Sequence, residues 1–333
     1  MTATTATTRS TMQAMVQDTY GGPEVLQLQQ ISRPAITDEQ VLIRVRAAGV
    51  NPADWAIMSG LPYIARPVYG FGRPKNQVRG TDVSGHVEAV GAAVTRFRPG
   101  DEVFGSCDGS YAEYAAASEK SVALKPSNLT FEQSAAVPMA ALVAFQAVAQ
   151  HGNVQAGQEV LINGASGGIG TFAVQIAQSL GAHVTGVCSG RNADLVRSVG
   201  ADQVIDYTQN DFTRGEQRYD FILDNVANHS LSALRRVLTP SGTLVPNGGE
   251  FDNLWFAGAG RVIATRLLQP FVKHNLRPFI LSMNTEDLVA VAELLEAGKV
   301  TPVVDRTYPL DDLPQAIGYV GDGHARGKVV ITL

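Results

Sequence analysis

The chain has 333 residues, of which 45% are hydrophobic and 17% charged, and its formal net charge is −5. This composition indicates a soluble globular protein of about two domains. The acidic balance argues against a nucleic-acid-binding surface, and no apolar run approaches the roughly 20 residues needed to cross a membrane. Because Cys107 and Cys188 are the only cysteines, we expect neither a disulfide framework nor a thiolate metal site, and we expect a cytoplasmic protein.

The N-terminal residues 1–14 form a Thr-rich segment without the apolar core of a secretory signal. The lack of acidic residues and the presence of Arg9 also fit an organelle transit peptide. A single Arg without an amphipathic pattern favours a disordered tail, which is our prediction for residues 1–14.

From Met15 to about Lys125, short apolar segments alternate with Gly, Pro and Asp. Alternating apolar and polar residues are typical of half-buried strands, and frequent turn residues are typical of an all-β domain. We therefore predict a small, partly open barrel. Its strands include Val41–Ala47, Gly85–Gly91, a strand fed by the turn in Pro99–Gly105, and Tyr111–Ala116.

Beyond Thr130, a suitable N-cap for an Ala-rich helix running to Gln150, helical and strand patterns alternate. This alternation predicts a doubly wound parallel sheet, and hence an α/β fold for the second domain. The predicted strands are Glu159–Asn163, His183–Cys188, Gln203–Ile205, Phe221–Asp224 and Gly242–Pro246, and the predicted helices are Gly168–Leu180, Asn192–Val199 and Ser230–Leu238.

The C-terminal part contains one more predicted helix, Thr285–Ala297, followed by Thr301–Val304 and the strand Lys328–Leu333. We assign this part to the β domain. The predicted division places residues 15–126 and 285–333 in the β domain and residues 127–284 in the nucleotide-binding domain.

The most informative segment joins the strand ending at Asn163 to the helix that follows it. The spacing Ala165-x-Gly167-x-x-Gly170 is a variant of the G-x-G-x-x-G pattern of dinucleotide-binding turns. Gly167 lets the backbone approach a pyrophosphate, Gly170 lets the helix pack on the strand, and unpaired helix N–H groups face the anion. The predicted cofactor-binding turn comprises Ala165, Ser166, Gly167, Gly168, Ile169 and Gly170.

Six short motifs follow one another along the chain: Ala48–Asp54 (AGVNPAD), Gly80–Gly85 (GTDVSG), Pro99–Phe104 (PGDEVF), Gly109–Tyr114 (GSYAEY), Gly164–Gly170 (GASGGIG) and Gly200–Asp206 (GADQVID). With these motifs, the chain resembles the medium-chain dehydrogenase/reductase superfamily from Met15 to Leu333, and within it the zinc-free quinone oxidoreductase branch. The resemblance implies a GroES-like β-barrel domain, a Rossmann domain and a C-terminus that returns to the barrel.

The expected absence of metal rests on departures from the zinc-dependent members of this superfamily, which bind catalytic zinc through an early Cys, a His and a later Cys. Here the first position falls at or beside Asn51–Pro52 and the His position at Thr81. Zinc prefers thiolate and imidazole ligands in a tetrahedron, and the six His residues show no ligand spacing. Without a Lewis acid, hydride transfer remains feasible where the acceptor delocalises the charge, as quinones and α,β-unsaturated carbonyl compounds do.

The second strand of the nucleotide-binding domain indicates the choice of cofactor. An NAD-preferring site would place a carboxylate at its end, whereas this strand is followed by Ser189 and Arg191, with no carboxylate until Asp194. Arg offers charged, planar donors to a 2′-phosphate, so we predict NADPH. The resemblance adds further cofactor contacts at Tyr207, Asn225, Val226, Gly248 and Gly249, although Tyr207 also fits a surface aromatic residue.

The resemblance places Asn51 beside the nicotinamide, although an Asn before Pro52 also commonly serves a turn. Trp55 stands where many relatives have a Tyr, and an indole has no workable pKa for protonating a product. The proton donor is then Tyr63, Tyr69 or water. Val143 replaces a common Thr near the nicotinamide. The segment 61–78, rich in basic and aromatic residues, is either a substrate lid or an ordinary surface loop.

These observations predict an NADPH-dependent, metal-independent reductase of a small-molecule quinone or enone. As many relatives are dimers, we expect a homodimer that binds neither nucleic acid nor membrane. Two alternatives remain open: an enoyl-thioester reductase, and a nucleotide-binding sensor or structural protein with little turnover.

Overall fold

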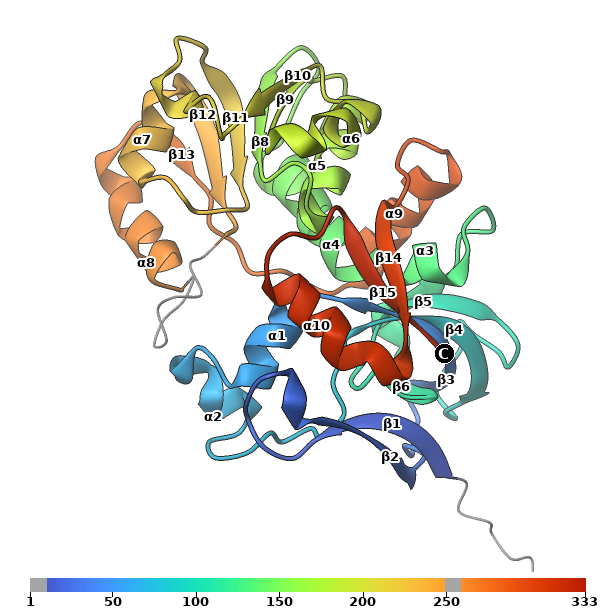
Figure 1. The fold of residues 1–333 in the computed structure, drawn as a ribbon. Helices are drawn as coiled ribbons and strands as arrows, with labels where there is room; N and C mark the ends of the chain where they lie inside the picture. Colours follow the sequence, from blue (N-terminus) through green and yellow to red (C-terminus); the bar gives the residue numbers. More distant parts are fainter. Residues whose placement is uncertain (1–10, 249–258) are drawn as a thin grey trace, which may run out of the picture.

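The computed structural model describes residues 11–248 and 259–333, which form two domains (Figure 1). The lower domain in this view contains the N-terminal strands and the C-terminal return, and the upper domain contains a parallel sheet. Among the described residues, no helix has the length and apolar character required to span a membrane.

The lower, GroES-like domain is built on a seven-stranded sheet of order β14-β15-β3-β4-β5-β7, with β6 paired to β3, and on a separate antiparallel pair β1-β2. Its strands are β1 (Thr11–Gln17), β2 (Leu26–Ser32), β3 (Gln40–Val50), β4 (Asp82–Val90), β5 (Glu102–Ser106), β6 (Tyr114–Ser118), β7 (Val122–Leu124), β14 (Val304–Pro309) and β15 (Lys328–Thr332). The helices of this domain are α1 (Pro52–Ser59), α2 (Arg66–Tyr69), α3 (Phe131–Ala135) and α10 (Leu313–Gly321).

The upper, Rossmann domain has a six-stranded parallel sheet of order β10-β9-β8-β11-β12-β13. Its strands are β8 (Glu159–Asn163), β9 (His183–Cys188), β10 (Gln203–Asp206), β11 (Tyr219–Asp224), β12 (Leu238–Pro246) and β13 (Asn275–Leu276). Its helices are α4 (Pro138–Phe145), α5 (Gly168–Ser179), α6 (Ala193–Ser198), α7 (Leu231–Arg236), α8 (Ala259–Leu268) and α9 (Thr285–Glu296).

The central strand β8 explains why the sheet is covered on both faces. Val160, Leu161 and Ile162 are fully buried, as expected for a continuous apolar run in a parallel sheet. Val160 and Ile162 join the apolar cluster of α4 and α5, whereas Leu161 faces the cluster of α7. The carboxyl end of β8 therefore emerges between two helical layers, at the glycine turn.

The predicted disordered tail is wrong for its last four residues. β1 begins at Thr11 and pairs with β2 in a register that joins Thr11 to Ser32. Met12 and Ala14 are buried in an apolar cluster with Tyr114. Pairing and burial of one strand face order this segment, a long-range effect that its polar composition does not reveal.

The single helix predicted up to Gln150 is divided in the structure. Thr130 caps α3 as expected, since its Oγ1 accepts a hydrogen bond from the Gln133 amide at 3.2 Å. Pro138 then starts a separate helix, α4, because it has no N–H for the preceding turn. A π-helical turn, Gln146–His151, completes this region.

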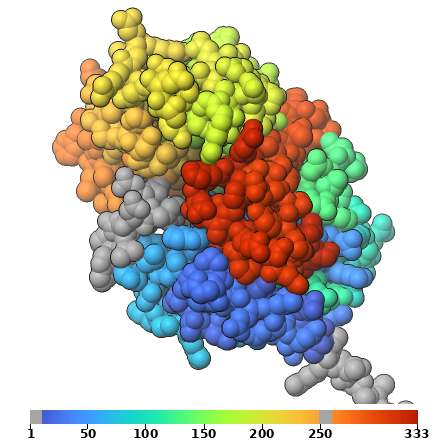
Figure 2. All heavy atoms as spheres, viewed as in Figure 1, coloured from blue at the N-terminus to red at the C-terminus, as the bar shows by residue number. Residues whose placement is uncertain are grey.

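The chain also rejoins the barrel sheet later than predicted. Leu288, Val291 and Leu295 of α9 lie in the apolar cluster formed around α4 and α5. Helix α9 thus packs on the Rossmann domain and reaches β7, and the return to the sheet domain begins with β14. Figure 2 shows the C-terminal residues, in red, extending between the yellow-green Rossmann domain and the blue N-terminal strands.

Candidate functional site: a nucleotide-binding turn beside a buried polar cluster

The turn between β8 and α5 leaves the first turn of the helix open. Gly167 is the N-cap residue in an extended conformation and provides no side-chain cap. The first helical hydrogen bond runs from the Thr171 amide to the Gly167 carbonyl oxygen at 3.0 Å. The N–H groups of Ile169 and Gly170 precede this bond and have no backbone acceptor among the described residues, whereas the Gly168 N–H faces the Gly327 carbonyl oxygen across a parallel bridge. The Ile169 and Gly170 N–H groups form an arrangement suited to a phosphate anion.

The two glycines of the motif have different physical roles. A Cβ on Gly170 would overlap the carbonyl oxygen of Gly164 and lie 2.7 Å from the Ala165 Cα. Gly170 therefore permits close packing of helix on turn. A Cβ on Gly167 would meet only the Gly164 carbonyl oxygen, at 3.6 Å, so this position borders open space. The residues present fit a pyrophosphate that approaches the Gly167 backbone.

The turn is also held from two other segments of the chain. The Ser166 Oγ accepts a hydrogen bond from the Asn192 Nδ2 at 3.1 Å, while the buried Asn192 Oδ1 has no hydrogen-bond partner within residues 11–248 and 259–333. The Gly327 amide donates to the Ser166 carbonyl oxygen at 2.9 Å, and Gly327 pairs with Gly167 as a parallel bridge. Asn192 and Gly327 were not found by sequence reasoning, because their contacts with the turn are long-range.

The end of β9 carries the residues predicted to select the cofactor. Arg191 is exposed and its guanidinium has no hydrogen bond or ion pair with a described residue. A carboxylate, Asp206, comes from the neighbouring strand β10 and accepts hydrogen bonds from the Thr208 amide at 3.0 Å and the Thr208 Oγ1 at 2.8 Å. These bonds, with others from Gln209 and the Gly190 amide, lower its pKa. Both carboxylate oxygens of Asp206 thus accept hydrogen bonds from residues of the turn that follows it.

Two more predicted residues lie at this edge. Tyr207 follows β10 and is 56% exposed, which leaves both earlier interpretations open. Ser189 is the residue before a 3-10 turn and makes no side-chain cap there.

The carboxyl ends of β11 and β12 meet at the predicted nicotinamide side. The Asn225 Oδ1 accepts from the Asn247 Nδ2 at 2.8 Å, while the buried Asn225 Nδ2 has no hydrogen-bond partner among the residues that the structure describes. Val226 is 44% exposed. A Cβ on Gly248 would lie 2.5 Å from the Asn225 backbone carbonyl, so this glycine accommodates the adjoining loop rather than open space. The prediction for Gly249 lies outside the described residues.

Asn51 lies in a buried polar cluster at the junction of β3 and α1. Its backbone amide donates to the Asp54 Oδ2 at 2.8 Å, and its side-chain Nδ2 donates to the Asp82 Oδ2 at 3.0 Å. The Lys328 ammonium donates to the Asn51 Oδ1 and to the Val50 carbonyl oxygen at 3.1 Å. The alternative assignment of Asn51 to the turn before Pro52 also holds, because Asn51 is the N-cap of α1.

The cluster connects both domains through Asp82, and Tyr111 joins it within the sheet domain. The Asp82 Oδ1 accepts from the Met139 amide at 3.1 Å, which caps α4 from outside, since Pro138 has no N–H. The Tyr111 hydroxyl donates to the Asp54 Oδ2 at 2.8 Å. Sequence reasoning assigned no role to Asp54, Asp82, Tyr111 or Lys328, although the first three lie in the quoted motifs.

Burial dominates the electrostatics of this cluster. Desolvation raises the pKa of Asp54 to about 6, against the lowering effect of hydrogen bonds from Tyr111 and Asn51. Burial also raises the pKa of Asp82 and lowers the pKa of Lys328, and the attraction between these two groups, 3.6 Å apart, opposes both shifts. A carboxyl group that exchanges its proton near neutral pH is therefore held beside Asn51.

The aromatic candidates Trp55, Tyr63 and Tyr69 lie in three different surroundings. Trp55 packs with the apolar residues between α1 and α10, where a Cβ on Gly321 would lie 2.7 Å from the indole Cδ1. Tyr63 lies under the Arg66 guanidinium, with 4.6 Å between Cζ and the ring centroid. Tyr69 ends α2.

A second buried cation borders this region. Arg79 is 9% exposed, its Nε donates to the Gln17 Oε1 at 3.0 Å, and its Nη2 has no hydrogen-bond partner in the described part of the chain. Burial lowers the pKa of Arg79, against the opposing effects of Tyr20, Asp54 and Tyr69.

Val143 lies within α4 and is 6% exposed, so it contributes packing but no polar group.

In the segment 61–78, Arg66 donates from Nε to the Gly60 carbonyl oxygen at 3.0 Å and lies over Tyr20 and Tyr63. The Arg66 guanidinium therefore stabilises the conformation of this loop. Both interpretations of the segment, substrate lid and surface loop, remain predictions.

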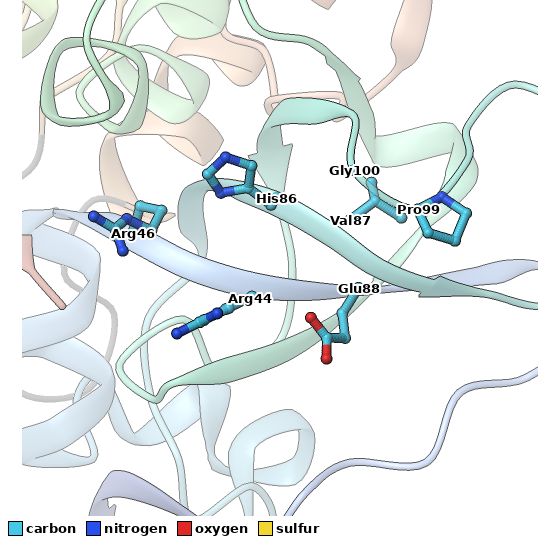
Figure 3. Close-up of a pocket in the computed structure, with 7 residues that line it drawn as sticks. All are labelled: Arg44, Arg46, His86, Val87, Glu88, Pro99 and Gly100. Carbon is cyan, nitrogen blue, oxygen red and sulfur yellow. The ribbon is translucent and has the colours of Figure 1, made fainter.

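A separate surface hollow of about 450 Å³ lies on the sheet domain (Figure 3). Arg44 of β3 precedes Asn51 by seven residues, a distance of roughly 20 Å along a strand. None of the residues that line the hollow belongs to the nucleotide-binding turn or to the cluster around Asn51. Its lining residues are Arg44, Arg46, His86, Val87, Glu88, Pro99 and Gly100.

Within residues 11–248 and 259–333, no group of three or more His, Cys, Asp or Glu side chains is arranged to hold a metal ion. Burial raises the pKa of Cys107 well above its usual value and that of Cys188 to about 11, which opposes formation of thiolate ligands. The absence of a resident metal remains a prediction.

The two-domain fold and the open glycine turn define the class of two-domain nicotinamide-nucleotide oxidoreductases. Comparison with known proteins agrees: residues 37–127 match the alcohol dehydrogenase GroES-like domain, and residues 199–331 match the zinc-binding dehydrogenase family. The chain is 37% identical to the human mitochondrial NAD(P)H oxidoreductase RTN4IP1 over 363 residues, which cover 99% of this chain and 91% of that protein.

Two further relatives are informative. The chain is 32% identical to 2-methylene-furan-3-one reductase of Solanum lycopersicum, covering 99% of this chain and 81% of that protein. The solved structure of the quinone oxidoreductase from Coxiella burnetii superposes with a TM-score of 0.85 at 29% identity, covering 97% of this chain and 100% of that one. The chain therefore belongs to the quinone oxidoreductase branch of the medium-chain dehydrogenase/reductase superfamily, and is an oxidoreductase that uses a nicotinamide cofactor.

Proposed function

We propose that the protein is an NADPH-dependent, metal-independent reductase of quinones or α,β-unsaturated carbonyl compounds. The observation that carries this proposal is the open N-terminus of α5, tied through the Gly327–Lys328 segment to the buried cluster around Asn51. Relatives described as a quinone oxidoreductase and a furanone reductase support this substrate class.

The chain's own groups divide the work between binding and charge stabilisation. The N–H groups of Ile169 and Gly170 bind the cofactor's pyrophosphate. When bound, the nicotinamide supplies the hydride. The Asn51 Nδ2 donates one of its two hydrogens to Asp82 and keeps the second for a carbonyl oxygen of the acceptor. Such a donor stabilises the negative charge that reaches this oxygen, and protonation from water or Tyr69 completes the reduction.

The preference for NADPH rests on Arg191 and Asp206. A carboxylate that selects NADH must accept from ribose hydroxyls, but both oxygens of Asp206 already accept hydrogen bonds within the chain. Arg191, which follows β9, makes no side-chain hydrogen bond or ion pair with a described residue. Arg191→Ala should reduce the ratio of kcat/KM for NADPH over NADH about tenfold or more. Arg197→Ala is the matched control, because its guanidinium already pairs with Asp194 at 3.1 Å.

An acceptor panel tests the reaction itself. NADPH oxidation would be followed with 1,4-benzoquinone, 9,10-phenanthrenequinone, an alkenal and crotonyl-CoA. Turnover of the quinones or the alkenal supports the proposal, and selective turnover of crotonyl-CoA would replace it with an enoyl-thioester reductase. Micromolar binding of NADPH without turnover of any acceptor would replace it with a nucleotide-binding sensor.

We also propose a homodimer formed through the β13 edge of the Rossmann sheet. Around this edge, Leu267, Phe271 and Ile280 are 68%, 85% and 81% exposed, a concentration of apolar surface that favours association. Light scattering after size-exclusion chromatography should give twice the chain mass of 35.3 kDa. The double variant Leu267→Glu, Phe271→Glu should be monomeric. A monomeric wild type would contradict this proposal.

A further inference from the structure

The ammonium of Lys328 connects the nucleotide-binding turn with the cluster around Asn51. The Lys328 side chain is 4% exposed, and its stem passes the first residue of α5: its Cδ lies 2.9 Å from where a Cβ of Gly168 would be. The preceding residue, Gly327, is hydrogen-bonded to Ser166 at 2.9 Å. One dipeptide thus contacts the turn through its backbone and Asn51 through its side chain.

Lys328 and Asp82 also determine which way the Asn51 amide faces. An ammonium has only donors and a carboxylate only acceptors, so the Asn51 oxygen must face Lys328 and its nitrogen must face Asp82. The opposite orientation would place an N–H against an ammonium and an oxygen against a carboxylate. The buried ion pair therefore selects one of the two amide orientations, at a site with 3% exposure.

We propose that Lys328 is a positioning residue: it fixes the orientation of the Asn51 amide relative to the nucleotide-binding turn, and turnover depends on that orientation. This inference rests on the proposed function. Lys328 acts on the reaction through Asn51. Because Gly327 is bonded to the nucleotide-binding turn, this segment also fixes the position of Asn51 relative to that turn.

The test must separate positioning from folding. Lys328→Met alone leaves the Asp82 carboxylate buried without its cation, which is strongly destabilising. The double variant Lys328→Met, Asp82→Asn removes both charges at nearly constant volume. The oxygen of the new amide still accepts from the Met139 amide, so the cap of α4 is retained.

A matched control exists in the same domain. The Lys125 side chain is 6% exposed, and its ammonium contacts Glu102 at 3.1 Å and the Leu129 carbonyl oxygen at 2.7 Å. Glu102 pairs with His86, at the opposite end of the β4–β5 ladder from Asp82. Lys125→Met, Glu102→Gln therefore removes, away from Asn51, an ion pair with an equally buried lysine, although its carboxylate is 47% exposed.

Kinetics, cofactor binding and melting temperature would be measured for the wild type and for both double variants. The Lys328/Asp82 variant should melt near the wild type and bind NADPH within about threefold, while kcat falls about 10- to 100-fold at little-changed acceptor KM. The Lys125/Glu102 variant should keep its kcat. A Lys328/Asp82 variant with restored stability and a kcat within threefold of wild type would overturn the inference.

A readout independent of turnover distinguishes this inference from the proposed function. The side-chain ¹⁵N–¹H signals of Asn51, assigned through Asn51→Ala, report the two partners of its amide. In the Lys328/Asp82 variant these signals should shift and lose their protection from exchange, and unchanged signals would overturn the inference. If the wild type turns over no acceptor, the proposed function fails, and the Asn51 signals alone decide whether Lys328 sets the amide orientation.

Discussion

The amide of Gly327 donates a hydrogen bond to the carbonyl oxygen of Ser166 at 2.9 Å, which attaches the C-terminal return to the nucleotide-binding turn. Gly327 has a φ of 92°, and a Cβ there would overlap the carbonyl oxygen of Val303. This contact therefore requires glycine on two grounds: backbone conformation and space.

Gly327→Ala should lower the free energy of unfolding by about 3 kcal/mol, measured by urea denaturation. Gly323→Ala is the control, because Gly323 has a similar φ of 73° but open space around its Cβ position. It should cost only the backbone strain of about 1 kcal/mol. An equal decrease in the free energy of unfolding in the two variants would contradict the close approach of Gly327 to the Val303 carbonyl oxygen.

The two glycines of the turn should respond differently to alanine. Gly167→Ala should keep the wild-type melting temperature but weaken NADPH binding at least tenfold, because its methyl group would occupy the space that a pyrophosphate needs. Gly170→Ala should lower the melting temperature, because its methyl group overlaps the Gly164 carbonyl oxygen. Calorimetry and fluorescence titration measure the two quantities. Unimpaired cofactor binding by Gly167→Ala would contradict the placement of the pyrophosphate.

The pKa of Asp54, raised from 3.8 to about 6, makes folding stability depend on pH. The folded state holds this proton more tightly than the unfolded state, so the free energy of unfolding should fall as pH rises from about 4 to about 6, by up to ~3 kcal/mol. Asp54→Asn should remove this decrease and be the more stable protein at pH 7. Asp194→Asn, at an exposed carboxylate, should retain the wild-type slope. Chemical denaturation across this pH range measures both.

The ion pair between Arg261 and the fully buried Asp224 should anchor α8 to the end of β11. Arg261 also donates to the His229 carbonyl oxygen at 3.0 Å. Arg261→Met should lower the free energy of unfolding by about 3 to 5 kcal/mol, because it leaves the Asp224 carboxylate buried without its cation. Arg266→Met, at an exposed site on the same helix, should change it by less than about 0.5 kcal/mol in urea denaturation. Similar effects of both variants would exclude this anchoring role.

The fold could be predicted largely because its signals are local. Strand and helix periodicities located β8, β9, β11 and α5 within a few residues, and the motif between Gly164 and Gly170 identified the turn. The missed elements depend on tertiary contacts: β1 is ordered by pairing with β2, and α10 packs on α1. Local patterns contain no information about these partners.

The candidate site was predictable only in part, for the same reason. Asn51 was found from its motif, but its partner Lys328 is 277 residues away in sequence. The resemblance put Trp55 where many relatives have a Tyr, but only the structure shows that the small residue Gly321 on α10 leaves room for the indole. The orientation of a side chain depends on its neighbours in space, and the neighbours of Asn51 and Trp55 come from distant parts of the sequence.

The most direct test of the proposed function is the rate of NADPH oxidation by protein dialysed against EDTA, with 9,10-phenanthrenequinone as the acceptor and NADH as the comparison. We predict that turnover persists after chelation and that kcat/KM is higher with NADPH than with NADH. Loss of turnover on chelation with recovery on adding Zn²⁺, or NADPH binding without any acceptor reduction, would contradict the proposed function.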